Sequence, residues 1–183
     1  MCHAKQTTLK SVQLNPSTIL AHATQILAAY GLADLTMRRL ARSLDVAPGA
    51  LYWHFPSKQE LLGAIANQLL AGVQPPETTP GARLQSRAEW SQIVDYCVAI
   101  YSAMTSLRDG AEITLAALAS GTTERDLRAD VRKTAGSQGE IAFHYVLGAA
   151  MDTQAQQAVA SALGKADAAL ATTDAQHVRR NVE

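Results

Sequence analysis

The sequence predicts an all-α protein built from two parts. Apolar residues recur every three or four positions over most of the 183 residues, and no segment sustains the alternation of a half-buried strand. Helix-start residues such as Asn15 and Ser57 precede these segments. Apolar residues make up 48% of the chain and alanine is abundant, which suits closely packed helices.

The first predicted helix runs from Pro16 to Tyr30. Asn15 suits an N-cap, Pro16 suits the first helical position, and Gly31 suits the residue after the helix end. Its apolar positions share one face, which we expect to pack beneath the next elements. They are Ile19, Ala23, Ile26, Leu27 and Tyr30.

Residues 36–62 (TMRRLARSLDVAPGALYWHFPSKQELL) predict a short helix, a tight turn, a second short helix and the start of a third. The first helix has Met37, Leu40, Ala41 and Leu44 on one face. Asp45 fits a sharp turn because Asp tolerates the left-handed backbone region. Pro48 fits the first turn of the second helix. This arrangement is a helix-turn-helix, whose second helix enters the major groove of DNA.

A proline and a capping box close this segment. Pro56 is expected to stop the second short helix, because the residue before proline avoids the helical region. Ser57 as N-cap and Glu60 three residues later form a capping box. The positive end of that helix, together with Lys58, predicts a clamp for a phosphate.

Residues 51–62 and 35–41 carry a family resemblance. Leu51-Tyr52-Trp53-His54-Phe55, followed by Pro-Ser-Lys and a Leu-Leu pair, resembles the DNA-binding domain of TetR-family bacterial transcription regulators. The resemblance spans roughly residues 10–72. It implies phosphate contacts by Tyr52, Trp53, His54 and Lys58, and a DNA contact by Arg38. Alternatively, the aromatic residues pack against the first and fourth helices, and Arg38 is a solvated surface charge.

The residues that would enter the groove first carry no hydrogen-bonding side chain. They are Ala47, Pro48, Gly49 and Ala50. They offer apolar contact with thymine methyl groups and a close backbone approach. We therefore expect phosphate contacts to dominate affinity, with specificity from Arg38, methyl contacts and DNA shape.

A proline- and glycine-rich segment at 72–81 predicts the boundary between a DNA-binding domain, residues 1–72 (the head), and a helical ligand-binding and dimerisation domain, residues 73–183 (the body). The head carries six Lys/Arg and three Asp/Glu up to residue 73, whereas the remainder is mildly acidic. A helix is expected from Ser57 to about Ala71. The body is expected to hold helices at 86–107, 111–119, 124–135 and 140–163.

The body also resembles the ligand-binding domain of the tetracycline repressor, through Arg108-Asp109-Gly110-Ala111 and Phe143 to Gly148. Candidate ligand-binding residues are Gln74, Trp90, Tyr96, Ile100, Met104, Thr114, Leu118, His144 and Asp152; Phe143 and Met151 are further candidates. A ligand pocket is mostly apolar with few polar groups. The alternative for each apolar member is a place in the core.

Four positions depart from the resembled repressor. Thr114 stands where that protein has a metal-ligating histidine and Leu118 where it has an arginine. Asp152 replaces a glutamate and Tyr96 an asparagine. We therefore expect an aromatic or amphipathic small molecule rather than a magnesium–tetracycline complex, and no metal or cofactor.

Other classes of protein lack support in the sequence. There is no GxSxG, phosphate-cradling glycine loop or HExxH, and His144 and Asp152 are too far apart on one helix to form a catalytic pair, so no enzyme is expected. Cys2 and Cys97 fit two free thiols in a reducing compartment. No apolar run approaches the ~18 residues that a membrane span needs. We expect a cytoplasmic protein.

The expected function is that of a transcriptional regulator, a homodimeric repressor that leaves a palindromic DNA operator when a small-molecule inducer binds the body. One alternative is a regulator that activates or has no small-molecule response. The other is a helical ligand-binding or scaffold protein without specific DNA binding. Family dimers pair two C-terminal helices, and residues 164–183 are polar. Either the chain is incomplete at its C-terminus or the dimer uses other surfaces.

Overall fold

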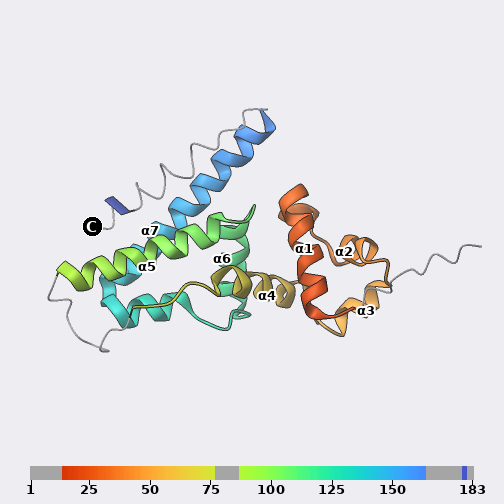
Figure 1. The fold of residues 1–183 in the computed structure, drawn as a ribbon, viewed down its shortest axis with the longest axis horizontal. Helices are drawn as coiled ribbons and strands as arrows, with labels where there is room; N and C mark the ends of the chain where they lie inside the picture. Colours follow the sequence, from red (N-terminus) through yellow and green to blue (C-terminus); the bar gives the residue numbers. More distant parts are fainter. Residues whose placement is uncertain (1–13, 77–86, 164–178, 181–183) are drawn as a thin grey trace, which may run out of the picture.

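The computed structural model describes residues 14–76, 87–163 and 179–180. Within these ranges the chain forms α-helices and one 3-10 turn and no strand, which confirms the all-α prediction. In Figure 1 the head and the body lie at opposite ends of an elongated molecule, and α4 (Lys58–Leu70) lies between them.

The head consists of α1 (Pro16–Tyr30), the 3-10 turn η1 (Leu32–Asp34), α2 (Met37–Ser43), α3 (Pro48–Tyr52) and α4. The predicted caps are confirmed at two helices. Asn15 Oδ1 accepts a hydrogen bond from the Thr18 N–H at 2.9 Å, and Ser57 Oγ accepts one from the Glu60 N–H at 3.1 Å. Thr36 caps α2 in the same way through the Arg39 N–H. These bonds satisfy N–H groups that the helices leave free.

The turn between α2 and α3 has the predicted left-handed residue. Asp45 has a φ of 55°, and the Val46 N–H closes the turn on the Ala41 carbonyl at 3.0 Å. Leu51 is fully buried and anchors α3 to the rest of the head. The helix-turn-helix therefore follows from local hydrogen bonds and one apolar anchor.

Two expectations for the head are wrong. Tyr30 is 55% exposed rather than packed in the stripe of α1, because it ends the helix beyond the core, and its ring lies beneath the Arg39 guanidinium at 4.0 Å. The second short helix ends at Tyr52, before Pro56. The His54 and Phe55 N–H groups both bond the Leu51 carbonyl, so the chain tightens into a turn there.

The body consists of α5 (Arg87–Thr105), α6 (Gly110–Ser120) and α7 (Leu127–Ala162). Gly121 ends α6 in the left-handed region, close to the helix end predicted at 119. The last two predicted helices are one interrupted element. It starts at Leu127 rather than near Thr123, because Asp126 is the residue that caps the Arg128 and Ala129 N–H groups. Its break lies at Gly136, with φ 57° and ψ −138°, within the gap predicted between the helices at 124–135 and 140–163.

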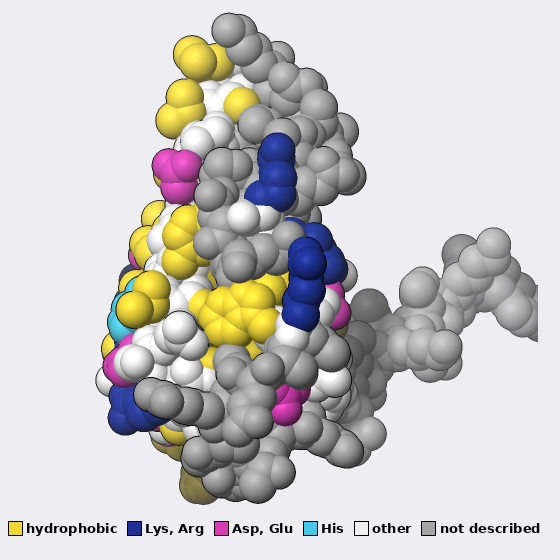
Figure 2. Space-filling model, turned by 90° about the vertical axis from the view of Figure 1, so that its left-hand side faces the viewer, with side chains coloured by type: hydrophobic (Ala, Val, Ile, Leu, Met, Phe, Trp, Pro, Cys, Tyr) yellow, Lys and Arg dark blue, Asp and Glu magenta, His cyan; other side chains and the backbone are white. Residues whose placement is uncertain are grey.

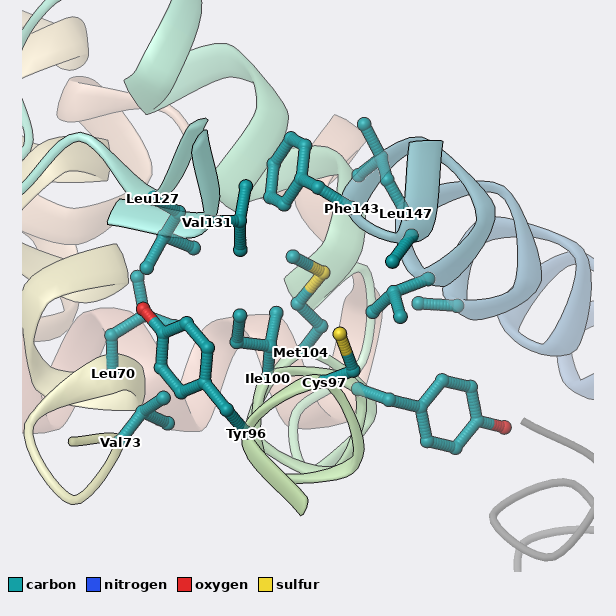
Figure 3. Close-up of a cluster of buried hydrophobic side chains, with 14 of the residues drawn as sticks. Leu70, Val73, Tyr96, Cys97, Ile100, Met104, Leu127, Val131, Phe143 and Leu147 are labelled. Carbon is teal, nitrogen blue, oxygen red and sulfur yellow. The ribbon is translucent and has the colours of Figure 1, made fainter. Parts of the chain in front are cut away.

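Two apolar cores share helices across the predicted boundary. The head core includes Leu107, Ile113 and Ala117 from the body, and the body core includes Leu70 from α4. Figure 3 shows Leu70 and Val73 on the same cluster as Phe143, Met104 and Cys97. The boundary at 72–73 remains a prediction.

The helices α4 and α6 lie in close contact. A Cβ on Gly63 of α4 would overlap the carbonyl oxygen and side chain of Thr122, just beyond α6. Only glycine allows this approach. The connection between head and body is therefore a packed helix pair as well as a chain segment.

No helix in the described ranges is long and apolar enough to cross a membrane.

Candidate DNA interface and ligand site

The N-terminal end of α3 is open to solvent. Ala47, Pro48 and Gly49 are exposed and Ala50 is half-buried, while Leu51 on the opposite side is buried. A Cβ on Gly49 would meet no atom within 4 Å. The four residues predicted to enter the groove therefore form a smooth, narrow tip with accessible backbone.

The aromatic residues that follow are also on the surface. Trp53 is 90% exposed and Tyr52 is 48% exposed, so the alternative in which they pack against the first and fourth helices is wrong for both. His54 and Lys58 are half-buried. Exposed aromatic side chains of this size are uncommon on a surface without a partner.

Two of the three α2 arginines differ clearly in their surroundings. Arg38 is exposed and remains available to a partner. Arg39 forms an ion pair with Asp34 and stacks on Tyr30, so it fixes η1 to α2. The structure thus distinguishes Arg38, a candidate DNA contact, from Arg39, which has a structural role. The two adjacent arginines cannot be told apart in this way from the sequence.

The candidate ligand residues in the body fall into three groups. Tyr96, Ile100, Met104 and Thr114 are buried, as is Phe143. Trp90 and Leu118 are half-buried. Gln74, His144 and Asp152 are exposed, and Met151 is 39% exposed.

The structure does not bring His144 and Asp152 together with the buried candidates, because both lie on the exposed side of α7. His144 Nδ1 lies 2.8 Å from the Glu140 carbonyl on the same helix, and Asp152 Oδ2 accepts a hydrogen bond from Gln156. Their neighbours Phe143 and Thr153 are buried, on the side of α7 that packs against the rest of the body. Thr114 is buried, but its hydroxyl already donates to the Gly110 carbonyl at 2.8 Å.

A cavity of about 450 Å³ lies where α4 ends, beside Gln74. Its lining combines apolar and polar side chains from α4, the following segment and the α6–α7 connection. The lining residues are Asn67, Leu70, Ala71, Gln74, Pro75, Glu124, Arg125 and Leu127. A volume and a lining of this kind suit a small molecule.

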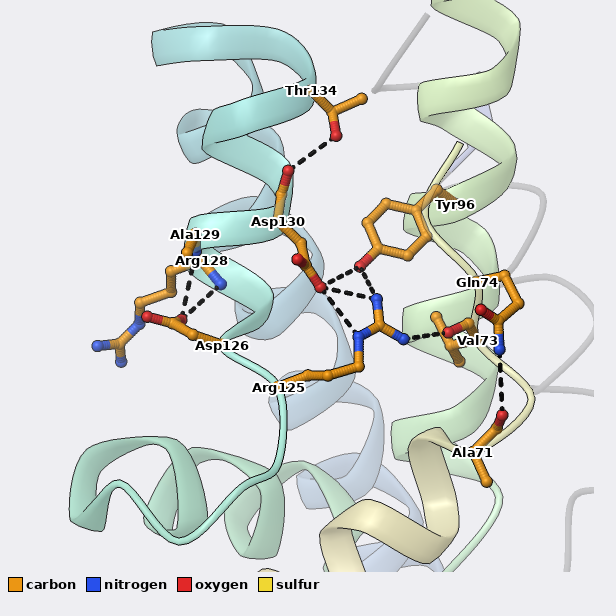
Figure 4. Close-up of polar contacts among 10 residues, drawn as sticks. All are labelled: Ala71, Val73, Gln74, Tyr96, Arg125, Asp126, Arg128, Ala129, Asp130 and Thr134. Atoms are coloured by element: carbon orange, nitrogen blue, oxygen red, sulfur yellow. Dashed lines mark hydrogen bonds and ion pairs between the residues drawn. The ribbon is translucent and has the colours of Figure 1, made fainter. Parts of the chain in front are cut away.

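Arg125 connects three elements at this cavity (Figure 4). Its Nη1 donates to the Val73 carbonyl at 2.6 Å, and its Nη2 and Nε donate to Asp130 Oδ2 at 2.7 and 3.2 Å. Nη2 also reaches the Tyr96 hydroxyl at 3.3 Å. The guanidinium therefore ties the end of α4 to α5 and to the start of α7.

Arg125 and Asp130 were missed as site residues. The available signal is an Arg and an Asp five residues apart around a helix start, and that spacing alone does not indicate contact with Val73 or Tyr96. Burial, followed by the neighbouring Asp130 carboxylate, raises the pKa of the Tyr96 hydroxyl. Tyr96 therefore stays protonated and available as a donor to Asp130, which lies 3.4 Å away.

The far end of the body has a mixed surface. Figure 2 shows hydrophobic side chains gathered at the centre of this face, with Lys and Arg side chains beside them. Along α7, Ile141, Met151, Val159 and Leu163 are large apolar residues exposed to solvent. Within the described ranges, no group of three or more His, Cys, Asp or Glu residues is placed to hold a metal ion.

Comparisons with known proteins agree with the geometry of the head. The family model described as "Bacterial regulatory proteins, tetR family" matches residues 19–65, the segment from α1 to α4. The tetracycline repressor protein class G of Vibrio anguillarum is 29% identical over 156 residues, covering 80% of this chain and 72% of the relative.

Solved structures extend the similarity over the body. The crystal structure of BioQ from Mycobacterium smegmatis has a TM-score of 0.67 and 35% identity, covering 93% of this chain and 98% of that chain. A structure of BioQ with its natural double-stranded DNA operator has a TM-score of 0.63 and 37% identity, covering 90% and 100% of the two chains. With similarity of this extent across head and body, the chain belongs to the TetR family of bacterial regulatory proteins.

Proposed function

We propose that the protein is a transcriptional repressor that binds a DNA operator through the head and leaves it when a small molecule binds the body. The observation that carries the proposal is the exposed tip of α3 beside Tyr52 and Trp53, held in place by the buried Leu51. Two relatives support DNA binding by a repressor: one is named a tetracycline repressor protein, and BioQ has been solved with its double-stranded DNA operator.

In this proposal the head binds DNA mainly through contacts with the DNA phosphate backbone. The α3 tip, residues 47–50, enters the major groove and touches thymine methyl groups. Tyr52, Trp53, His54 and Lys58 contact phosphates, where the N-terminus of α4 adds partial positive charge. Arg38 reaches the DNA from α2. Since the tip carries no polar side chain, DNA shape contributes to specificity.

A homodimer places two heads on one operator. The exposed apolar residues of α7 on one face, Ile141, Met151, Val159 and Leu163, suit the same surface of a second copy. Two heads on successive major grooves must lie about 34–36 Å apart. Residues 164–183, whose polar sequence raised the question of how the dimer forms, lie almost wholly outside the described residues.

The ligand site is proposed in the body, with Gln74, Trp90, Tyr96, Ile100, Met104, Thr114 and Leu118 as the retained candidates. The cavity beside Gln74 supports a polar end for this ligand site, because Arg125 lines it. There Arg125 donates a hydrogen bond to the Val73 carbonyl, just after the end of α4. A ligand that displaces this contact frees α4 and changes the separation of the heads. An aromatic or amphipathic compound fits a lining that combines apolar and polar side chains.

Three further expectations belong to the same proposal. The protein acts in the cytoplasm, where its DNA is, and has no enzymatic role. The head (1–72) and body (73–183) act as two functional domains joined through α4. The alternative of a scaffold without specific DNA binding gains no support from the exposed α3 tip.

The test is selection of binding sites from a random duplex pool, with Tyr52→Ala and Lys58→Ala alongside wild type. Wild type should enrich a two-fold symmetric site, and both variants should bind it at least about tenfold more weakly. Lys58→Ala should also reduce the slope of log affinity against log salt by about 1, because one phosphate contact is lost.

Lys133→Ala is the matched control, since Lys133 is an exposed lysine of the body. It should bind like wild type. The proposal would be contradicted if wild type enriched no site, or if the Tyr52 and Lys58 variants bound the enriched site as tightly as wild type does.

A further inference from the structure

The turn between α5 and α6 touches the head directly. Asp109 Oδ2 accepts a hydrogen bond from the Leu32 N–H at 2.6 Å. Arg108 Nη1 donates to the Ala29 carbonyl at 3.4 Å, near the end of α1. A cation at a helix C-terminus also interacts favourably with the helix dipole. The body thus binds both the last turn of α1 and the first residue of η1.

Asp109 makes this contact in place of a local one. It stands at the N-cap of α6, where an aspartate usually accepts a hydrogen bond from its own helix. Its side chain makes no such bond, and its φ is 60°, in the left-handed region. A non-glycine residue keeps this conformation only where its surroundings impose it. Here the carboxylate is directed at the head.

The start of α6 is capped instead by α7. Gln154 is buried, and its Oε1 accepts a hydrogen bond from the Ala111 N–H at 2.9 Å. Its Nε2 donates to the Leu107 and Met104 carbonyls at 2.6 and 3.2 Å. Leaving such buried groups unpaired is costly, so the turn has to follow α7 when α7 moves at Gln154.

The head is shaped to receive the Asp109 carboxylate. Gly31 has a φ of 85°, and a Cβ there would lie 2.7 Å from Asp109 Oδ2. Beside this contact, a cavity of about 240 Å³ lies between Ala28 of α1 and Ala158 of α7, with Arg108 and Gln154 also in its lining. The turn between α5 and α6 therefore joins head and body by hydrogen bonds at the edge of a cavity.

We propose that Asp109 is a positioning residue that sets the angle of the head on the body, and that Gln154 passes movements of α7 to it. The inference rests on the proposed DNA-binding function and adds a second connection beside α4. A head held at two separate places has a fixed direction, whereas a head held by α4 alone can pivot. A fixed direction is what a dimer needs to select one half-site separation.

The test compares Asp109→Gly with Asp109→Asn in the full-length protein. Both substitutions suit the left-handed backbone, but only asparagine keeps an oxygen that can accept from Leu32. The first readout is hydrogen exchange of the Leu32 amide, which should speed up at least about tenfold in Asp109→Gly and much less in Asp109→Asn.

The second readout is the preference for half-site separation. Affinity is measured for the operator enriched by wild type, for versions with one or two base pairs added or removed between half-sites, and for a single half-site. Asp109→Gly should lose about tenfold of the preference for the natural separation, with single half-site affinity within about twofold of wild type. The preference of Asp109→Asn for the natural separation should lie between those of wild type and Asp109→Gly.

A second pair of variants tests the relay from α7. Gln154→Glu keeps the acceptor for Ala111 but loses both donors, and should weaken the separation preference in the same direction. Gln157→Glu introduces the same charge in the same cavity outside the relay and should behave like wild type.

The inference is overturned if Asp109→Gly exposes the Leu32 amide yet keeps the separation preference of wild type. It is equally overturned if single half-site binding falls as much as operator binding, which would indicate a general loss of structure. Wild type that enriches no operator would instead refute the proposed function, while the exchange readout would still report whether the Asp109 contact exists.

Discussion

The head and the body use the same element, the amphipathic helix, but their boundaries arise differently. In the head, α1, α2 and α4 each begin at a side-chain cap that lies within three residues of its partner. In the body, α6 begins at a residue whose side chain binds the head, and its cap comes from Gln154 of α7. Short-range signals therefore account for the helix starts of the head and for α7, which Asp126 caps, but not for the start of α6.

The functional surfaces follow the same division. The candidate DNA contacts lie within residues 38–58 and need only α3 to be anchored by Leu51. The polar contacts of the body join Val73 and Tyr96 to the pair Arg125 and Asp130, so they bring together three segments that are far apart in the sequence. A DNA-binding surface can be formed by residues that are close together in the sequence, whereas a ligand-binding site needs distant segments to pack together.

The largest expected effect tests whether the two parts fold independently. Phe143→Ala should lower the free energy of unfolding by about 3–5 kcal/mol, because Phe143 is fully buried in the body core. Since each core borrows residues from the other part, thermal unfolding followed by calorimetry should remain one transition. A head that melts separately at its wild-type temperature would show that the cores are independent.

The next effect concerns the contact between α4 and α6. Gly63→Ala should destabilise the protein by about 1–3 kcal/mol, because its Cβ would overlap the Thr122 backbone. Chemical denaturation measures the change. An unchanged midpoint would mean that α4 and α6 can separate freely and that this contact does not join head and body.

A pH-dependent effect is expected in the body core. Burial raises the pKa of the Cys97 thiol from 9.0 to about 11, so the folded state favours the protonated form. This stabilisation is complete below pH 9 and is lost as the pH rises toward 11. The free energy of unfolding should fall by about 1 kcal/mol between pH 8 and 10. Cys97→Ala should lack that part of the pH dependence, and an equal fall in this variant would refute the assignment.

The smallest expected effect returns to the head. Gly49→Ala should raise stability by about 0.5–1 kcal/mol, because alanine favours the helix and nothing lies within 4 Å of the new Cβ. The same change should weaken operator binding if the backbone of the α3 tip approaches DNA closely. Denaturation and binding assays on one preparation separate the two effects. Loss of stability would mean that the tip is more tightly packed than its exposure indicates.

Much of the fold could be predicted because its signals are local. Asn15-Pro16 and Gly31 bounded α1 correctly, and Asp45 marked the turn of the helix-turn-helix. The start of α7 was misplaced because Thr123 and Asp126 are both acceptable N-caps, and only the packing of Leu127 into the body core selects between them. Helical periodicity likewise could not show that Tyr30 lies beyond the edge of the core.

The sequence by itself determined the helical class, the helix-turn-helix and the residues at the tip of α3. It did so because hydrogen bonds and turns that close within four residues depend on neighbours in the chain. Only the tertiary structure decided that Trp53 is exposed, that Arg125 holds Val73, and that Asp109 binds Leu32. Those features depend on which surfaces remain after the helices pack, and the physical cause is the burial of apolar faces that belong to distant segments.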